Sequence, residues 1–180
     1  DPGAVRPLVA RSVAALEALR EITRGVFPAQ LSRSGLEVAL GSLLAATIVA
    51  LPIGILCHRQ PRLRSSILNA LNFVQTIPSI ALFGVLIPIL SKIGQGIGWL
   101  PAVIAAMLYA LLPIIRNTYT AIRNVDPALR SAATGMGMST LQRLLHVEIP
   151  LAMPLIIAGI RVAVVMNIGV TAIAAYIGAG

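Results

Sequence analysis

The sequence predicts an all-α integral membrane protein. Hydrophobic residues make up 57% of the 180-residue chain, and charged residues make up only 11%. The mean hydropathy of +0.90 is well above that of soluble domains, which need more surface charge than this chain contains. Long apolar runs recur along the chain without the alternation of apolar and polar residues that strands of a membrane β-barrel require. The predicted spans are therefore helices.

Four apolar runs approach the ~20 residues that a helix needs to cross ~30 Å of hydrocarbon. The first contains Pro52 and the third is the shortest. The second is interrupted by a polar segment, Gln75-Thr76-Ile77-Pro78-Ser79. We expect four to five transmembrane helices in this chain, four of them near residues 36–57, 65–90, 100–115 and 151–177.

The basic residues of the loops predict the orientation. Seven arginines fall in the first and third loops, residues 58–64 and 116–150, whereas the second loop contains only Lys92. The positive-inside rule places the arginine-rich loops in the cytoplasm and suits Trp99 as an outer interfacial anchor. This asymmetry explains much of the net charge of +8 without a nucleic-acid partner.

The N-terminal segment departs from this charge pattern. Residues 1–35 contain five arginines, although they should lie outside the cell if there are four spans. A stretch within them, residues 8–26, predicts an amphipathic helix on the outer surface or the lead-in from an upstream span. We expect both ends to continue in a longer protein.

Residues 126–150, between the third and fourth spans, predict a helical hairpin. Asp126 is a good N-cap and Pro127 suits the first helical position, so a short helix is expected over 128–136. Gly137 can adopt the left-handed conformation that often follows a helix.

A capping-box pattern, Ser139 with Gln142, begins the second helix of the hairpin, which is expected to run to about residue 147. Pro150 and Pro154 are expected to bracket the start of the fourth span. On spacing alone, the hairpin either packs only against its own spans or docks into a groove on a partner protein.

Polar residues within the spans are candidates for a solute path, since they are costly against lipid. Pro78 removes a backbone hydrogen bond and disfavours helix at the preceding residue, so the broken span either faces a path or forms a packed kink. Arg161 lies about 10 Å beyond Pro154, where a charge costs about 2.5–3.5 kcal/mol and must reach the boundary, pair or face water. Asn167 either faces the path or bonds a neighbouring helix. The candidates from the residues alone are Gln75, Thr76, Pro78, Ser79, Arg161 and Asn167.

Three segments of the hairpin resemble the EAA loop of ABC-importer permeases: Ser131-Ala132-Ala133, Gly137, and Val147-Glu148-Ile149-Pro150. The family pattern is E-A-A, three residues, G, nine residues and I-x-L-P, and all the spacings match. Over residues 36–180 the chain is similar to the osmoprotectant branch of that family. The stretches that carry this likeness are 75–84, 111–119, 159–161, 167–169 and 177–180.

The resemblance implies a type I ABC-importer permease fold, with residues 36–180 as the transmembrane domain and 126–150 as the cytoplasmic coupling loop. It implies a multi-pass protein of the bacterial inner membrane that imports compatible solutes such as glycine betaine, choline or related quaternary ammonium osmolytes. It adds Asn117 to the path candidates and assigns contact with the ATPase to Ser131, Ala132, Ala133, Gly137, Met138, Leu141, Val147 and Pro150.

The resemblance also implies partners. A second permease subunit, identical or different, would complete the path, and a periplasmic or lipid-anchored protein would deliver the solute. Separate ATPase subunits would bind ATP and magnesium, because this chain has no G-x-x-x-x-G-K-[S/T] phosphate loop. We expect the permease to be non-catalytic and to bind no cofactor, metal or nucleic acid.

One position departs from the family pattern, because Ser131 occupies the place of the usual acid. A serine offers only a neutral hydroxyl, whereas a carboxylate accepts stronger charge-assisted hydrogen bonds. We therefore expect docking to depend on shape and apolar contact.

Three other functions remain open. They are an ABC importer for a different small solute, a secondary transporter or channel, and a structural membrane subunit without a path. Proline-broken spans also suit a secondary transporter, but cation coupling favours acids in the spans, and Glu37 is the only one.

Overall fold

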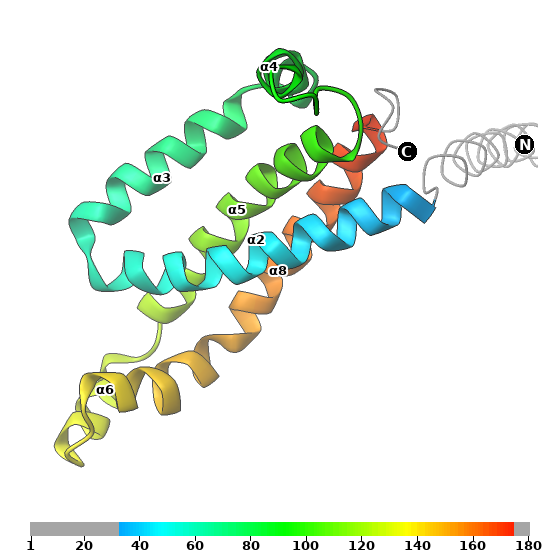
Figure 1. The fold of residues 1–180 in the computed structure, drawn as a ribbon. Helices are drawn as coiled ribbons and strands as arrows, with labels where there is room; N and C mark the ends of the chain where they lie inside the picture. The colour runs from blue at the N-terminus through cyan, green and yellow to red at the C-terminus, as the bar shows by residue number, and fades with distance from the viewer. Residues whose placement is uncertain (1–32, 175–180) are drawn as a thin grey trace, which may run out of the picture.

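The computed structural model describes residues 33–174. Helices follow one another along this part of the chain (Figure 1), and a short π-helical turn joins the last two. The predictions for residues 1–32 and 175–180 lie outside the described residues. The elements are α2 (Arg33–Arg59), α3 (Pro61–Thr76), α4 (Ser79–Ser91), α5 (Trp99–Arg123), α6 (Pro127–Gly135), α7 (Thr140–Arg143), η1 (Leu144–Glu148) and α8 (Ile149–Ala174).

Three long helices, α2, α5 and α8, form the body of the described structure, and α5 packs extensively against both of the others. In an apolar 18-residue stretch of α5, 56% of the residues are buried. The corresponding stretches of α2 and of the helix that contains α8 are 28% and 22% buried. Helix α5 is therefore the central helix, and the other two leave most of their apolar side chains at least partly exposed, as suits contact with lipid.

Small residues bring these helices close together. Ala46 and Ala50 of α2, Ala110 of α5 and Ala163 of α8 are fully buried in one cluster. A β-carbon at Gly54 would lie 2.7 Å from Cβ of Thr118, and one at Gly159 would lie 2.5 Å from Cβ of Asn117. Close backbone approach at small residues is a common mode of helix packing in membranes.

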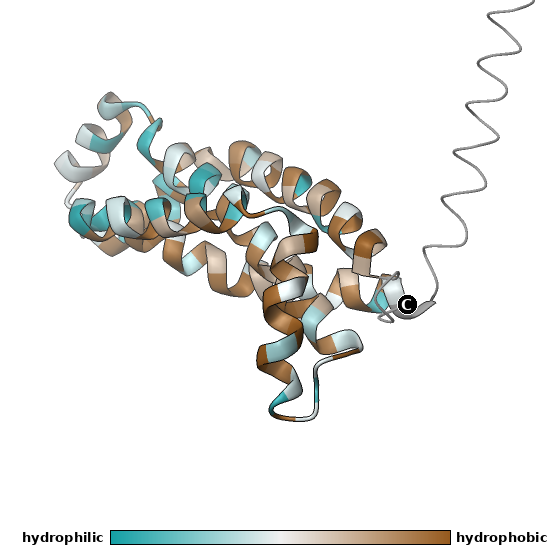
Figure 2. Ribbon diagram, turned by 90° about the horizontal axis from the view of Figure 1, so that it is seen from above, coloured by the Kyte–Doolittle hydropathy of each residue, from teal (hydrophilic) through white to brown (hydrophobic). Residues whose placement is uncertain are grey.

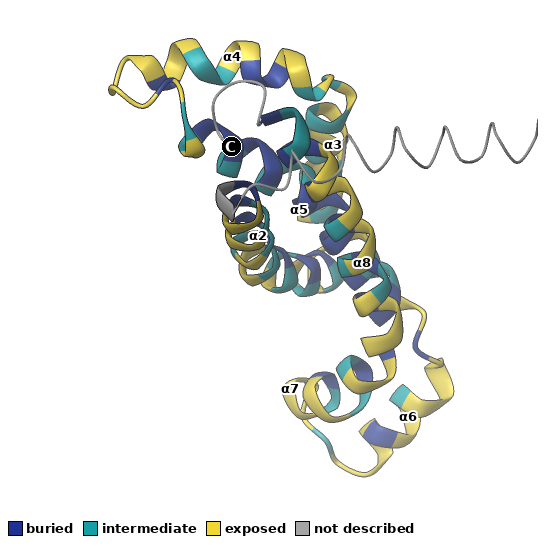
Figure 3. Ribbon diagram, turned by 90° about the vertical axis from the view of Figure 1, so that its right-hand side faces the viewer, coloured by how far each residue is buried: buried dark blue, intermediate teal, exposed yellow. Residues whose placement is uncertain are grey.

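The second predicted span is a bent pair of helices. Helices α3 and α4 meet at Ile77 and Pro78 with an angle of 99° between them, so α4 lies across one end of the bundle (Figure 3). The predicted interruption is confirmed, but residues 65–90 are not one straight span. The described residues contain three helices long and apolar enough to cross a membrane, or four if the bent pair counts as one span.

The third predicted span is longer than expected. The sequence suggested an end near residue 115 and placed Arg116 and Arg123 in a loop, but α5 remains helical to Arg123. The loop prediction was wrong because charged residues need not end a helix where it leaves the membrane. There, Tyr119 accepts hydrogen bonds from Arg64 Nη1 at 2.5 Å and Arg123 Nη1 at 2.8 Å.

Hydrophilic residues gather at the end of the molecule that contains α6 and the junction of α2 with α3 (Figure 2). The helices between this end and the opposite one are largely hydrophobic. The hairpin of α6 and α7 projects beyond the bundle and is mostly exposed (Figure 3). This arrangement matches the predicted cytoplasmic side, where the arginines concentrate.

Candidate functional site

The hairpin begins as the sequence predicts. The Asp126 side chain accepts a hydrogen bond from the backbone N–H of Ala128 at 2.8 Å, and Pro127 occupies the first position of α6. Helix α6 ends at Gly135, and Gly137 then takes a φ of +82°. Since side chains disfavour this left-handed region, glycine is the residue that makes the turn without strain.

The second half of the hairpin begins with the predicted capping box. Ser139 Oγ accepts from the backbone N–H of Gln142 at 3.3 Å, and Gln142 Oε1 accepts from the backbone N–H of Ser139 at 2.8 Å. No break follows, because α7, the π turn and α8 form one helical segment from Thr140 to Ala174. The prolines expected to bracket the start of the fourth span, Pro150 and Pro154, lie in the first turns of α8, and the helical segment passes through both.

The outer face of the hairpin, defined here as Leu129, Met136, Leu141 and Leu145, consists of exposed apolar side chains. Their exposed fractions are 45%, 70%, 57% and 51%. Apolar side chains that project beyond the bundle on a polar hairpin are typical of a protein contact surface. Of the residues predicted to contact an ATPase, Ala133 is buried within the hairpin, Met138 and Val147 are partly buried, and Ser131, Ala132, Gly137, Leu141 and Pro150 are exposed.

A buried carboxylate lies at the base of the hairpin. The side chain of Glu148 is only 3% exposed, and its Oε1 accepts a hydrogen bond from Arg143 Nε at 3.0 Å. Arg130 Nε lies 3.7 Å from the same oxygen, and His58 Nε2 lies 3.7 Å from Oε2. These contacts were not expected from the sequence. The available signal was that Glu148 is the only acid between Pro127 and Gly180.

At the bend between α3 and α4, two residues bond across to α5. Pro113 has no N–H to donate to the carbonyl of Tyr109, four residues earlier. Gln75 Nε2 donates to that carbonyl at 3.0 Å instead. In return, the Tyr109 hydroxyl donates to the carbonyl of Ile77, where α3 ends. The broken span is thus held to α5 by a reciprocal pair of hydrogen bonds, neither of which was expected from the sequence, because Tyr109 lies in another helix.

Replacing Gln75 with leucine is expected to lower the free energy of unfolding by about 1 kcal/mol, because the carbonyl of Tyr109 loses its donor. Asn72→Leu is the matched control, since this amide is exposed on the same helix and its side chain forms no hydrogen bond with residues 33–174. Unfolding of the purified protein in detergent measures the stability of both variants. Equal stability of the two variants would contradict a structural role for Gln75.

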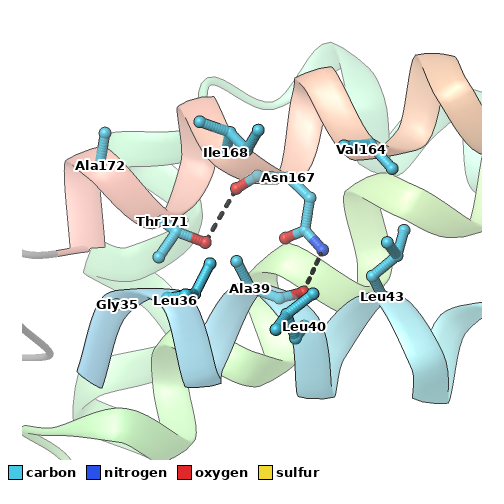
Figure 4. Close-up of a pocket in the computed structure, with 10 residues that line it drawn as sticks. All are labelled: Gly35, Leu36, Ala39, Leu40, Leu43, Val164, Asn167, Ile168, Thr171 and Ala172. Atoms are coloured by element: carbon cyan, nitrogen blue, oxygen red, sulfur yellow. Dashed lines mark hydrogen bonds between the residues drawn. The ribbon is translucent and has the colours of Figure 1, made fainter. Parts of the chain in front are cut away.

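Asn167 joins α8 to α2. It is 1% exposed, and its Nδ2 donates to the backbone carbonyl of Ala39 and to Ser42 Oγ, both at 3.0 Å. Figure 4 shows it beside Thr171 in a crevice of about 230 Å³ that apolar side chains of α2 and α8 line. Of the two roles that the sequence left open, the structure provides the interhelical hydrogen bond.

Asn117 and Arg161 lie elsewhere. Asn117 Nδ2 donates to the carbonyl of Pro113 at 2.7 Å within α5, and its β-carbon packs on Gly159. Arg161 is exposed on α8 and forms no ion pair within residues 33–174. Of the options that the sequence left open for Arg161, pairing is therefore not provided by residues 33–174.

The structure brings the predicted coupling residues together on one hairpin but does not gather the predicted path residues. Gln75, Thr76, Pro78 and Ser79 lie at the bend of α3 with α4. Asn167 lines the crevice of Figure 4 without the other path candidates. The path assignments stay predictions.

Comparison with protein families places most of the chain in one group. Residues 50–180 match the family described as "Binding-protein-dependent transport system inner membrane component". The chain is also 58% identical over 135 residues to the osmoprotectant import permease protein OsmW of Salmonella typhimurium, which covers 75% of this chain and 63% of that protein.

Two further relatives and a solved structure agree. The carnitine transport permease protein OpuCB of Listeria monocytogenes is 41% identical over 145 residues, with 81% of this chain and 64% of that protein covered. The glycine betaine/carnitine/choline transport system permease protein OpuCB of Bacillus subtilis is 39% identical over 145 residues, with the same coverage. The chain thus spans a little under two thirds of these relatives. A structure of the MetNI methionine ABC transporter in an inward-facing conformation matches with a TM-score of 0.72 at 23% identity, over 88% of this chain and 74% of that chain, and so supports the fold.

Proposed function

This chain belongs to the family of binding-protein-dependent transport system inner membrane components, and from that membership we propose that it is the permease subunit of an ATP-driven importer for compatible solutes. It is a multi-pass membrane protein with the helical fold of a type I ABC-importer permease. The proposed solutes are glycine betaine, choline, carnitine or related quaternary ammonium osmolytes, since the relatives carry these in their names.

The observation that carries the proposal is the geometry of the hairpin. Both of its helices are capped at their N-termini, a turn at Gly137 with a φ of +82° joins them, and the second helix continues without a break into α8. A force on the outer face of the hairpin therefore reaches a membrane-spanning helix through continuous helical backbone. This is what a coupling element between an ATPase and a solute path requires.

The proposed mechanism uses two permease subunits and two ATPase subunits. The outer face of each hairpin docks into a groove on an ATPase, as an apolar helical surface does. ATP binding closes the ATPases and moves the hairpins, and the path changes from inward-open to outward-open. A separate binding protein delivers the solute. Hydrolysis occurs on the ATPase, where ATP and magnesium bind.

Selectivity is proposed to reside mainly in the binding protein. Recognition of a quaternary ammonium group favours aromatic cages, but the chain contains only one tryptophan, three tyrosines and three phenylalanines. Arg161 would repel a cation rather than attract it. Arg161 and the residues at the α3–α4 bend are proposed to line part of the path, because polar groups at membrane depth require protein or water around them.

Reconstitution tests the proposal. The complete permease, with its ATPase and binding protein in proteoliposomes, is expected to hydrolyse ATP several-fold faster when glycine betaine, choline or carnitine is present, and to accumulate that radiolabelled solute. Uptake that needs an ion gradient but no ATP would instead indicate a secondary transporter. ATP-driven uptake of a different solute class would still support a coupling role for the hairpin, but it would contradict the proposal that the solute is an osmolyte.

A further inference from the structure

The carboxylate of Glu148 lies where four segments of the chain meet. His58 belongs to the last turn of α2, Arg130 to α6 and Arg143 to α7, and each places a nitrogen between 3.0 and 3.7 Å from this carboxylate. Glu148 itself ends the π turn that leads into α8. With 3% of its side chain exposed, the carboxylate has little contact with water, and these three partners supply its polar surroundings.

The π turn sets the register of this cluster. Arg143 and Glu148 are five residues apart, and in an α-helix of 3.6 residues per turn such residues point about 140° away from each other. A π turn links residues five apart, so it brings their side chains to the same face. The consequence of the π turn is therefore the contact of 3.0 Å between Arg143 Nε and Glu148 Oε1.

The two arginines extend the cluster to the rest of the hairpin and to α5. Arg130 Nη2 donates to the carbonyls of Ile122 and Arg123, the last residues of α5. Arg143 Nη1 donates to Thr134 Oγ1 of α6 at 3.0 Å. A connected set of hydrogen bonds and ion pairs therefore runs from the end of α5 through Arg130, Glu148 and Arg143 to both arms of the hairpin.

We propose that Glu148 is a positioning residue, which holds the coupling hairpin to the ends of α2 and α5 so that these helices and α8 move with it. This inference rests on the proposed function. Without the cluster, the hairpin would be held to the bundle by its two backbone connections, at Asn124 and through the π turn, and by the apolar packing of Leu144. A push from the ATPase would then bend the hairpin at its base, and less of it would reach the path.

The test uses the complete importer in proteoliposomes, with radiolabelled glycine betaine as the probe, and measures solute transported per ATP hydrolysed. Glu148→Gln preserves the size of the side chain and removes its charge. The expected result is a roughly tenfold lower transport per ATP, with ATP hydrolysis and assembly preserved. Glu37→Gln is the matched control, because this acid is exposed on α2 and its removal should leave the ratio unchanged. An unchanged ratio in Glu148→Gln would overturn the proposal.

A double-mutant cycle with Arg143→Gln separates positioning from general destabilisation. If the two residues act as one contact, the double variant should transport no less per ATP than either single variant. Two roughly tenfold losses that combine to about a hundredfold would show independent effects and overturn the proposal.

If Glu148→Gln fails to accumulate in the membrane, His58→Gln takes its place, because it leaves the Arg143 bond intact. A twofold or larger fall in the ratio supports the proposal and an unchanged ratio overturns it.

A second readout does not depend on transport. Spin labels at Met136, 70% exposed in the hairpin turn, and Leu63, 41% exposed in α3, report how firmly the hairpin is held to the bundle. The distribution of distances between the two labels is expected to be narrow in the parent protein and broad in Glu148→Gln. Absence of ATP-driven uptake in the parent would reject the proposed function, and equal widths in the two proteins would reject the role of Glu148.

Discussion

Replacing Gly159 with valine is expected to destabilise the protein by about 3 kcal/mol or more and to remove most of it from the membrane. A β-carbon at this position would lie 2.5 Å from Cβ of Asn117 and 3.1 Å from the backbone carbonyl oxygen of Pro113. Neither atom can rotate away, so α8 and α5 must separate along the contact that builds the centre of the bundle. Overpacking of this kind costs about 1–3 kcal/mol when neighbours can adapt, and more when they cannot.

Gly169→Val is the matched control for Gly159. It lies on the same helix with no atom within 4 Å of its position for a β-carbon, so the valine should cost less than about 1 kcal/mol. Unfolding in detergent and the amount of protein in the membrane measure both variants. Equal loss in the two would show that valine in α8 is harmful in itself, and that the close approach to Asn117 is not responsible.

Replacing Gly137 with valine is expected to uncouple ATP hydrolysis from uptake, lowering solute transported per ATP by about tenfold or more. The residue has a φ of +82°, which costs about 1–2 kcal/mol for a residue with a β-carbon, and more for a β-branched one. The turn must therefore change shape. A change of about 1.4 kcal/mol in the free energy of docking shifts the docking equilibrium tenfold. A modest change in the shape of the turn can therefore displace the outer face from its partner.

Two controls separate the turn from the bulk of the side chain. Gly137→Asn should keep most of the coupling, because asparagine tolerates the left-handed conformation. Gly135→Val places the same bulk two residues earlier, where no atom lies within 4 Å and φ is not positive, and should have a smaller effect. A Gly137→Asn variant as uncoupled as Gly137→Val would indicate that any side chain blocks docking, whereas full coupling in Gly137→Val would contradict the assignment of the hairpin.

The local structure of the hairpin was predictable because its signals are short-range. The cap at Asp126, the left-handed turn at Gly137 and the capping box of Ser139 with Gln142 each depend on residues within four positions of one another. The broken span was predictable for the same reason, since Pro78 disfavours helix at Ile77 directly.

The long-range features were not predictable from one sequence. The bond from Gln75 to the carbonyl of Tyr109 spans 34 residues, and that from Asn167 to the carbonyl of Ala39 spans 128. Periodicity and propensity carry no information about which helices meet. The π turn at 144–148 also escaped prediction, because it reads as ordinary helix in the sequence, and the surroundings of Glu148 therefore escaped as well.

The position of the hairpin tests the central claim most directly. Met136 is 70% exposed at the turn, and the native Cys57 is 1% exposed, so a Met136→Cys variant in a Cys57→Ser background provides one reactive thiol. We predict that a membrane-impermeant maleimide labels it in inside-out vesicles and not in intact spheroplasts, and that a short thiol crosslinker joins it to the ATPase subunit. Labelling from outside the cell, or protection in both preparations without a crosslink, would contradict a cytoplasmic hairpin that couples the ATPase to the membrane-spanning helices.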